Sequence, residues 1–178
     1  MEKKEIRRYV KELKSQLSPE EKLNGETKVL EQLRNNAAIA RCENLVAYWA
    51  MPDELPTRQI IEYFLQSKKI FLPVVCGTTL EFRRFESEKE LKAEARYGIF
   101  EPTSEETLTG DGSNTVILVP GVAFTAQGLR LGRGGGYYDR ILAQLPKAHK
   151  TGIALKCQLL DSLPVEQHDA IMDEVIVG

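Results

Sequence analysis

The pattern of apolar residues changes at residue 44, and this change constrains the fold more than any other feature of the chain. From there on, short apolar runs alternate with stretches of helical pattern. We predict strands over 44–50, 70–75, 80–85, 116–119, 151–156 and 174–177, helices over 58–67, 88–96 and 137–145, and a surface loop over 101–114. Strands that alternate with helices form a mainly parallel or mixed sheet covered on both faces. We therefore expect a single-domain α/β fold over 1–178, with three Rossmann-like layers and ligands beyond the carboxyl ends of the strands.

Two helices are predicted before this point. Over residues 3–17 the apolar positions form one stripe, and the stripe beside it is basic, with Lys3, Arg7, Lys11 and Lys14. The second helix runs from Pro19 to about Ala40. It begins with a capping box, in which Ser18 caps the helix, Pro19 takes the first helical position and Glu21 closes the box.

The charge balance limits the classes of function. The 178 residues include 24 lysines and arginines and 26 aspartates and glutamates, a net charge of −2, which argues against a generally basic nucleic-acid-binding surface. No apolar run approaches the roughly 18 residues of a membrane helix, and the N-terminus lacks the apolar core of a signal peptide. Three scattered cysteines and two histidines favour neither a disulfide framework nor a zinc site. We expect a cytoplasmic protein that binds neither membrane nor nucleic acid.

Charge is unevenly distributed along the chain. Residues 1–14 contain six basic and three acidic side chains, whereas residues 161–178 contain five acidic side chains and no lysine or arginine. The basic start and the acidic end can pair with each other, or they can flank an anionic ligand and its metal ion. The sequence alone leaves both possibilities open.

Six of the 13 glycines lie between Gly121 and Gly136, in the stretch PGVAFTAQGLRLGRGGGYYDRIL. Glycines let backbone N–H groups approach a ligand closely, and the helix predicted directly afterwards points its positive end at the same place. The nearby arginines are Arg130, Arg133 and Arg140. Together these features favour a polyphosphate cradle over the alternative of a mobile surface loop. The stretch is neither a Walker A motif nor GxGxxG, because no Gly-Lys-Ser/Thr follows and position 137 is tyrosine.

Asp139 lies in the first turn of that helix, where a carboxylate can stabilise the helix end or hold Mg²⁺ beside a phosphate. Both interpretations stay open on the sequence alone. No residue resembles a protein nucleophile, since the chain has no Gly-x-Ser-x-Gly elbow. Phosphoryl transfer needs none, because positioning and charge stabilisation suffice.

The segment PG-x-AF-x-x-x-G-x-RLGRGGGYYDR, residues 120–140, resembles the signature of the 5-formyltetrahydrofolate cyclo-ligase family, also called 5,10-methenyltetrahydrofolate synthetases. Further matches span nearly the whole chain: a basic first helix followed by LSPEE, YWAMPDELPT at 48–57, IFLPVV at 70–75, YGIFEP at 97–102 and GIALKCQLLDSLPVEQHDAIMD at 152–173. The resemblance implies an enzyme that uses ATP and Mg²⁺ to cyclise 5-formyltetrahydrofolate to 5,10-methenyltetrahydrofolate, releasing ADP and phosphate. It also implies a monomer whose partners are small molecules.

The resemblance implies roles for individual residues. The ATP contacts match Lys3, Lys4, Arg7, Arg130, Leu131, Gly132, Arg133, Gly134, Gly135, Gly136, Tyr137 and Tyr138. Arg133 is the best candidate to stabilise charge on the transferring phosphoryl group, with Lys3 and Arg7 assisting. The folate contacts match Trp49, Glu54 and the stretch from Arg133 to Tyr137, with the Glu54 carboxylate accepting from the amino-pyrimidinone edge of the pterin. The Mg²⁺ ligands match Asp139 and Asp169.

Two departures from the family pattern bear on affinity: Thr125 replaces an aspartate, and Pro56 interrupts the turn after Glu54. A non-catalytic nucleotide- or folate-binding module is the main alternative, and the presence of both Asp139 and Asp169 argues against it. A nucleic-acid-binding protein is a weaker alternative, because only Tyr9 interrupts the basic residues of the first helix.

Overall fold

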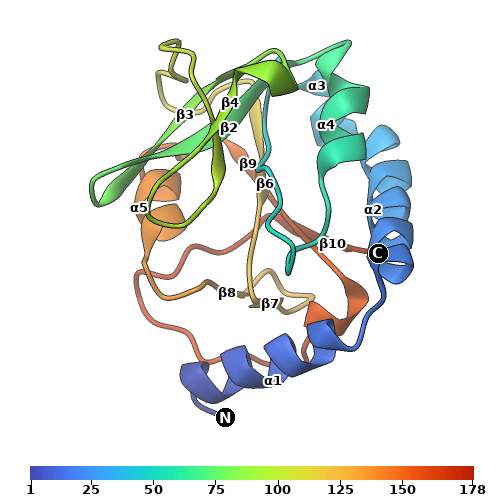
Figure 1. Cartoon of the computed structure of the whole chain (residues 1–178). Helices are drawn as coiled ribbons and strands as arrows, with labels where there is room; N and C mark the ends of the chain where they lie inside the picture. Colours follow the sequence, from blue (N-terminus) through green and yellow to red (C-terminus); the bar gives the residue numbers. More distant parts are fainter.

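A computed structural model describes all of residues 1–178, and its core is one six-stranded sheet (Figure 1). The helices are α1 (Lys3–Ser15), α2 (Pro19–Arg34), α3 (Ala37–Arg41), α4 (Arg58–Leu65) and α5 (Tyr137–Ala143). The strands are β1 (Asn44–Val46), β2 (Lys69–Cys76), β3 (Thr79–Phe85), β4 (Leu91–Ala93), β5 (Phe100–Pro102), β6 (Thr115–Val119), β7 (Ala123–Phe124), β8 (Arg130–Leu131), β9 (His149–Ala154) and β10 (Glu174–Val177). Two short 3₁₀ turns are η1 (Glu88–Glu90) and η2 (Lys156–Gln158).

The strand order of the sheet is β10-β9-β6-β1-β2-β3. All neighbouring pairs are parallel except β2 and β3, which form an antiparallel hairpin at one edge. Two small hairpins, β4-β5 and β7-β8, stand outside the sheet. The predicted α/β fold with a mixed sheet is therefore confirmed, and helices cover both faces of the sheet.

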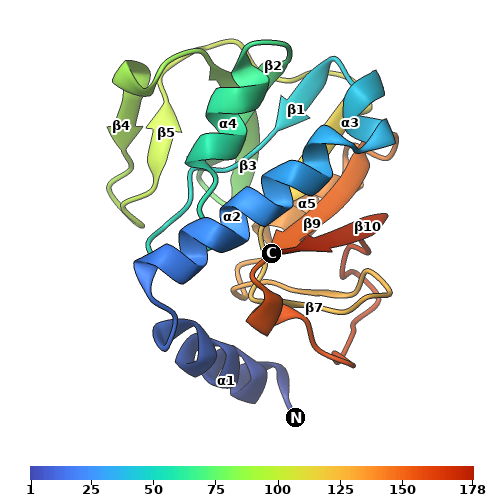
Figure 2. The same ribbon diagram turned by 90° about the vertical axis from the view of Figure 1, so that its right-hand side faces the viewer.

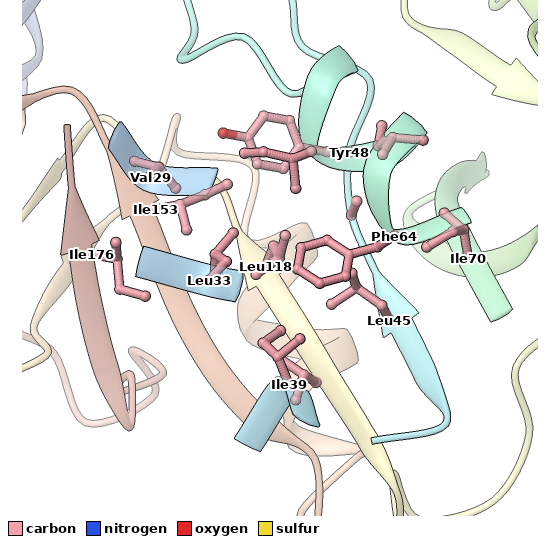
Figure 3. Close-up of a cluster of buried hydrophobic side chains, with 14 of the residues drawn as sticks. Val29, Leu33, Ile39, Leu45, Tyr48, Phe64, Ile70, Leu118, Ile153 and Ile176 are labelled. Carbon is pink, nitrogen blue, oxygen red and sulfur yellow. The ribbon is translucent and has the colours of Figure 1, made fainter. Parts of the chain in front are cut away.

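Alternating side chains of each strand build two cores. Leu45, Val116 and Leu118 pack with α2, α3 and α4 on one face (Figure 3), where α2 crosses the sheet diagonally (Figure 2). Val46 and Ile117 point to the other face and pack with α5. Because successive side chains point to opposite faces, a strand covered on both faces requires a continuous apolar run, as over residues 116–119.

A third, smaller cluster lies below the sheet. Ile6 and Val10 of α1 pack against Val122, Ala123 and Leu131 of the β7-β8 region. Helix α1 therefore lies beneath the β7-β8 hairpin rather than against the main sheet (Figure 1).

The connections diverge at one topological switch point, which we refer to as the crevice. The chain leaves β1 through α4 on one face of the sheet and leaves β6 through α5 on the other. Since β1 and β6 are parallel neighbours, the loops after them, residues 47–57 and 120–136, diverge at the same edge. Ligands of open α/β sheets bind at such a point, where the strand order reverses.

Several local predictions are confirmed and others are wrong. Ser18 accepts from the Glu21 N–H, and the Glu21 carboxylate accepts from the Ser18 N–H, so the capping box is present. The second helix does not continue to residue 40, because it ends at Arg34 and Asn36 caps a separate helix, α3.

The predicted helix over 88–96 is wrong. Ser87 caps only the turn η1, and residues 91–93 pair with residues 100–102 as the β4-β5 hairpin. The surface loop predicted over 101–114 therefore begins as a strand, and Thr107 forms a bridge to Arg83 at the sheet edge. The regular part of the predicted strand over 44–50 ends at Val46. None of the helices is both long enough and apolar enough to cross a membrane.

Candidate active site

Three loops meet at the carboxyl edge of the parallel strands, and helix α1 lies across them. The loops are residues 47–57 after β1, 120–136 after β6 and 155–173 after β9. They come from distant parts of the chain, yet side chains of α1 donate hydrogen bonds to each of them. The predicted ligand edge is therefore the place where these segments are held together.

The inward stripe of α1 consists of Lys3, Arg7 and Lys14, each of which contacts a different loop. Lys3 Nζ lies 2.8 Å from Asp169 Oδ2, Arg7 Nε donates to the Gly132 carbonyl at 2.9 Å, and Lys14 Nζ donates to the Asp53 carbonyl at 2.8 Å. Lys4 and Lys11 are exposed. Lys14 was predicted as part of a basic stripe only, and its burial shows that it belongs to the same inward row.

Lys3 joins the basic start of the chain to its acidic end, one of the two possibilities left open by the sequence. Its ammonium lies between Asp169 and Glu166, with a distance of 3.2 Å to Glu166 Oε1. The hydrogen bond to Asp169 raises the pKa of Lys3. Burial would raise the pKa of Asp169, but the hydrogen bond from Lys3 and the backbone bond in its loop outweigh it and lower that pKa. Both groups are therefore charged at neutral pH.

The glycine-rich segment turns sharply between β8 and α5. Gly134 and Gly136 have φ angles of +107° and +67°, in the left-handed region that suits glycine. A Cβ atom on Gly134 would lie 3.6 Å from Arg7 Nη2, so the guanidinium of α1 runs beside the loop. The glycine loop and the Arg7 guanidinium thus lie side by side.

Arg130 and Asp139 form a mostly buried ion pair under the loop. The Arg130 side chain is 6% exposed and that of Asp139 18%, with 3.3 Å between Nη1 and Oδ1. Arg130 Nε also donates to the Pro120 carbonyl. Asp139 Oδ1 further accepts from the N–H of Ala170 at 3.1 Å, so it connects the glycine-rich segment to the loop that contains Asp169. The two residues predicted as metal ligands are therefore brought to one corner of the site.

Arg133 and Glu54 meet across the crevice. Arg133 Nη2 lies 3.1 Å from Glu54 Oε1 and 2.8 Å from Asp53 Oδ1. The other carboxylate oxygen of Glu54 accepts from the Met51 N–H at 2.9 Å, which fixes the acidic turn. The Glu54 side chain is only 13% exposed, whereas the Arg133 side chain is 49% exposed. The sequence prediction of both residues is compatible with this position, but their contact with each other was not foreseen.

The two tyrosines after the glycines differ in their surroundings. The ring of Tyr137 lies under Arg140 and edge-on to Tyr97, with its hydroxyl 3.5 Å from the Gly77 carbonyl at the tip of the β2-β3 hairpin. Tyr138 packs over Arg130 and against Phe82. Its hydroxyl is buried without a hydrogen-bond partner, and burial raises its pKa. Tyr137 therefore faces the open side of the crevice, and Tyr138 faces the interior.

The remaining predicted residues occupy supporting positions. Trp49 packs at a tilt against Phe85, with 6.0 Å between ring centroids, and the Arg58 guanidinium lies 5.9 Å from the centroid of the Trp49 ring. Leu131 is buried in the α1 cluster. Thr125, a departure from the family pattern, closes the turn before Leu129 with its hydroxyl. Pro56 directly precedes Thr57, the N-cap residue of α4. Proline has no backbone N–H, and at this position before the helix no intrahelical hydrogen bond is lost.

The sequence analysis assigned neither Asp53 nor Lys14 to the site, although it placed Lys14 in the basic stripe. Asp53 accepts from Lys14 and Arg133 at once. Its signal was present in the acidic pair of the turn, but nothing in the sequence distinguished the two carboxylates. Lys14 carried a signal in its spacing, because positions 3, 7, 10 and 14 lie on one face of a helix.

The arrangement combines fixed cations, glycine N–H groups and a set of carboxylates. Lys3, Arg7 and Arg133 can bind an anionic ligand, and Glu54 can accept from the N–H groups of a heterocycle. Glu166, His168 and Asp169 offer ligand atoms within 4.8 Å of one another, and two of these residues supply the oxygen ligands that a hard cation prefers. No side chain in the site has the arrangement of an activated nucleophile.

The α/β fold brings these charged side chains together at the carboxyl edge of its parallel strands, the edge at which ligands of such sheets bind. The sequence profile of the 5-formyltetrahydrofolate cyclo-ligase family matches residues 1–178, so the chain belongs to this family of ligases.

Individual relatives agree with this assignment. The chain is 30% identical to the 5-formyltetrahydrofolate cyclo-ligase of Mus musculus, over 98% of this chain and 92% of the relative. It is 28% identical to the enzyme of that name from Haemophilus influenzae, over 99% of this chain and 97% of the relative. The NMR structure of Aquifex aeolicus 5,10-methenyltetrahydrofolate synthetase is similar over 99% of this chain and 89% of its own, with a TM-score of 0.85 and 31% identity.

Proposed function

We propose that this chain cyclises 5-formyltetrahydrofolate to 5,10-methenyltetrahydrofolate in a reaction that consumes ATP and requires Mg²⁺. In this reaction the formyl oxygen attacks the terminal phosphorus of ATP and ADP leaves. N10 then attacks the activated formyl carbon, the phosphate departs with the former formyl oxygen, and N10 loses its proton. The substrate supplies both nucleophiles, so the protein has to position and neutralise charge.

One observation carries the proposal: the cations of α1, the glycine-rich segment and the acidic turn converge on one crevice. Lys3 and Arg7 reach that crevice from α1, and Arg7 lies along the glycine loop. Arg133 and Glu54 approach from opposite walls. A phosphate-binding side and a heterocycle-binding side therefore lie within reach of one another, as transfer between two bound substrates requires.

In the proposed reaction, the triphosphate lies against the glycine N–H groups, Lys3 and Arg7. The Glu54 carboxylate accepts from the pterin edge, and Tyr137 covers the open side. Arg133 is proposed to donate to the equatorial oxygens of the phosphoryl group during transfer, where a fixed cation lowers the barrier most. The loop and the two tyrosines limit water around the reactive formyl group.

The acidic residues fit Mg²⁺ by their chemistry. Asp139 uses only Oδ1 in its contacts with Arg130 and Ala170, which leaves Oδ2 without a protein partner. Asp169 lies in the adjoining loop and pairs with Lys3. We propose that Asp139 and Asp169 hold the ion. When bound, it supplies positive charge that neutralises the phosphate oxygens.

The test mixes the purified protein with 5-formyltetrahydrofolate and follows the near-ultraviolet absorbance of the conjugated methenyl product. We expect an increase only when both ATP and Mg²⁺ are present, with one ADP per product. Asp169→Asn is expected to shift the Mg²⁺ dependence to higher concentration. Asp161→Asn, an exposed aspartate of the same loop, is the matched control. Nucleotide binding without any product under all conditions would contradict the proposal and favour a binding module.

A further inference from the structure

The Asp53 carboxylate lies between two cations that come from different parts of the site. Its Oδ1 lies 2.8 Å from Arg133 Nη2, and its Oδ2 lies 3.3 Å from Lys14 Nζ. The Lys14 side chain is only 5% exposed, although that of Asp53 is 47% exposed. A single carboxylate thus connects the mouth of the crevice to the interior face of α1.

We propose that Asp53 is a positioning residue, which anchors Arg133 to α1 through Lys14 so that Glu54 can exchange Arg133 for the folate. This inference rests on the proposed function and goes beyond it, because it assigns different tasks to the two neighbouring carboxylates of the turn. Asp53 holds the arginine, whereas Glu54 binds the substrate.

The two carboxylate oxygens of Glu54 have different partners. Its Oε2 accepts from the Met51 N–H, so Oε1 is the oxygen left for a ligand. Arg133 occupies that same Oε1 at 3.1 Å. A pterin that donates to Glu54 must therefore displace Arg133 from this atom. Because Nη2 of Arg133 already reaches Asp53, the guanidinium keeps an ionic partner at the mouth of the crevice when it releases Glu54.

Lys14 holds the Asp53 carboxylate from the side of α1. A buried ammonium requires compensating partners, and Lys14 finds both of its partners in one residue, the carbonyl oxygen and the carboxylate of Asp53. These two contacts fix the turn relative to α1 and orient Oδ1 towards the crevice. Burial would raise the pKa of Asp53, but the hydrogen bond from Arg133 and the charges of Lys14 and Arg133 lower it overall. The anchor is therefore ionised at neutral pH.

The experiment compares Asp53→Asn with Asp53→Glu and with a matched control. Asp111→Asn serves as the control, because Asp111 is 44% exposed, pairs with Lys147 at 2.7 Å and lies away from the crevice. For Asp53→Asn we expect kcat/KM for 5-formyltetrahydrofolate to fall by about tenfold to hundredfold. KM for the folate is expected to rise, because Arg133 stays on Glu54, while KM for ATP changes less. Asp53→Glu restores part of the loss, and Asp111→Asn stays within about twofold of wild type.

A double variant tests whether Asp53 acts through Arg133. If it does, Asp53→Asn lowers the activity of an Arg133→Ala chain no further, since the group that it positions is gone. A full additional loss in the double variant would overturn the proposal, and so would an unchanged folate KM in Asp53→Asn.

A binding titration separates this inference from the proposed function. Trp49 is the only tryptophan, and it lies next to the acidic turn, so its fluorescence reports folate binding without turnover. If wild type forms no methenyl product, the proposed function fails, and equal folate affinities of wild type and Asp53→Asn would then overturn the anchor as well. Weaker binding by Asp53→Asn alone supports the anchor. If Asp53→Asn does not fold, the double variant Lys14→Met/Asp53→Asn is measured in its place. It removes the buried Lys14 ammonium, which Asp53→Asn leaves without a counter-charge.

Discussion

The two edges of the parallel strands treat their charged groups in opposite ways. At the amino edge, the Glu174 carboxylate accepts from His149 Nε2 at 3.0 Å, Thr151 Oγ1 at 2.9 Å and Asn36 Nδ2 at 2.9 Å. These partners come from β9 and the cap of α3, which are fixed parts of the fold. At the carboxyl edge, Arg133 shares one nitrogen between two carboxylates of another loop, and half of its side chain is exposed.

The partners of a charged group therefore distinguish a structural charge from one that is available to a ligand. A carboxylate whose oxygens are all satisfied by neighbouring elements contributes to stability and has nothing left to offer. A cation held by exchangeable partners on surface loops can give up one partner when an anion arrives. The two edges should therefore respond differently to mutation, one in folding and the other in turnover.

The largest effect is expected from Asp139→Ala, and it marks a limit of this comparison. Asp139 lies at the carboxyl edge, but its partner Arg130 is buried. Removing the carboxylate leaves a buried guanidinium without its counter-charge, which costs about 3 kcal/mol of unfolding free energy. Urea denaturation measures this loss. Asp139→Asn keeps an acceptor for Arg130 and Ala170 and should lose less; equal stability of Asp139→Ala and wild type would contradict the structural role of the pair.

Arg133→Ala tests a charge at the carboxyl edge that is available to a ligand. We expect kcat to fall by about a hundredfold or more, because a donor to the transferring phosphoryl group is lost. The unfolding free energy should change by less than about 0.5 kcal/mol, since the side chain is half exposed. Arg34→Ala, which removes an exposed arginine on α2, is the control for the change in net charge. A loss of stability as large as that of Asp139→Ala would show that Arg133 has a structural role in the fold.

Glu174→Gln tests the amino edge. The glutamine cannot accept from His149, Thr151 and Asn36 together, so we expect a loss of about 1–2 kcal/mol in unfolding free energy. Turnover at saturating substrate should equal that of wild type at a temperature where both are folded. A reduced kcat in the folded variant would mean that the two edges are coupled through the sheet.

The smallest effect is a pH dependence. Burial would raise the pKa of Glu174, but the hydrogen bonds from His149, Asn36 and Thr151 lower it below its ordinary value. The contribution of this lowered pKa to stability is therefore complete above the ordinary glutamate pKa, and it is lost as the pH falls through the lower folded value. Below the ordinary pKa, the stability of wild type should thus decrease towards that of Glu174→Gln in parallel denaturation curves. A constant difference across the acid range would contradict this assignment.

The sequence was most informative where one local pattern decided the outcome. The capping box at Ser18 and the buried run over 116–119 appear as predicted, because capping chemistry and hydrophobic periodicity act over a few residues. The helix predicted over 88–96 does not form, because a contact outside the local pattern decides the structure there. Its cap at Ser87 is real, but pairing with residues 100–102 makes a hairpin more favourable than continuing the helix.

The same distinction between local patterns and long-range contacts applies to the site. The glycine-rich segment and the basic row of α1 could be identified from composition and spacing alone. Which carboxylate meets which cation could not, because those contacts join residues far apart in the chain, such as Lys14 with Asp53 and Arg133 with Asp53. Arg130 illustrates the limit: it looks like a ligand contact in the sequence, yet in the fold its side chain is 6% exposed and occupied by Pro120 and Asp139.

Helix α1 has a consequence for the order in which the molecule opens. It contacts the loops near residues 53, 132 and 169 but packs through only a small apolar cluster of its own. Cooperative units with few buried contacts open more often than the sheet they cover. Native-state hydrogen exchange should therefore find α1 detaching while the six strands stay protected. In that partly open form the crevice loses one wall. The occupancy of the site therefore depends on the local opening of α1, which is separate from global unfolding. A bound anion would shift this local equilibrium towards the closed form.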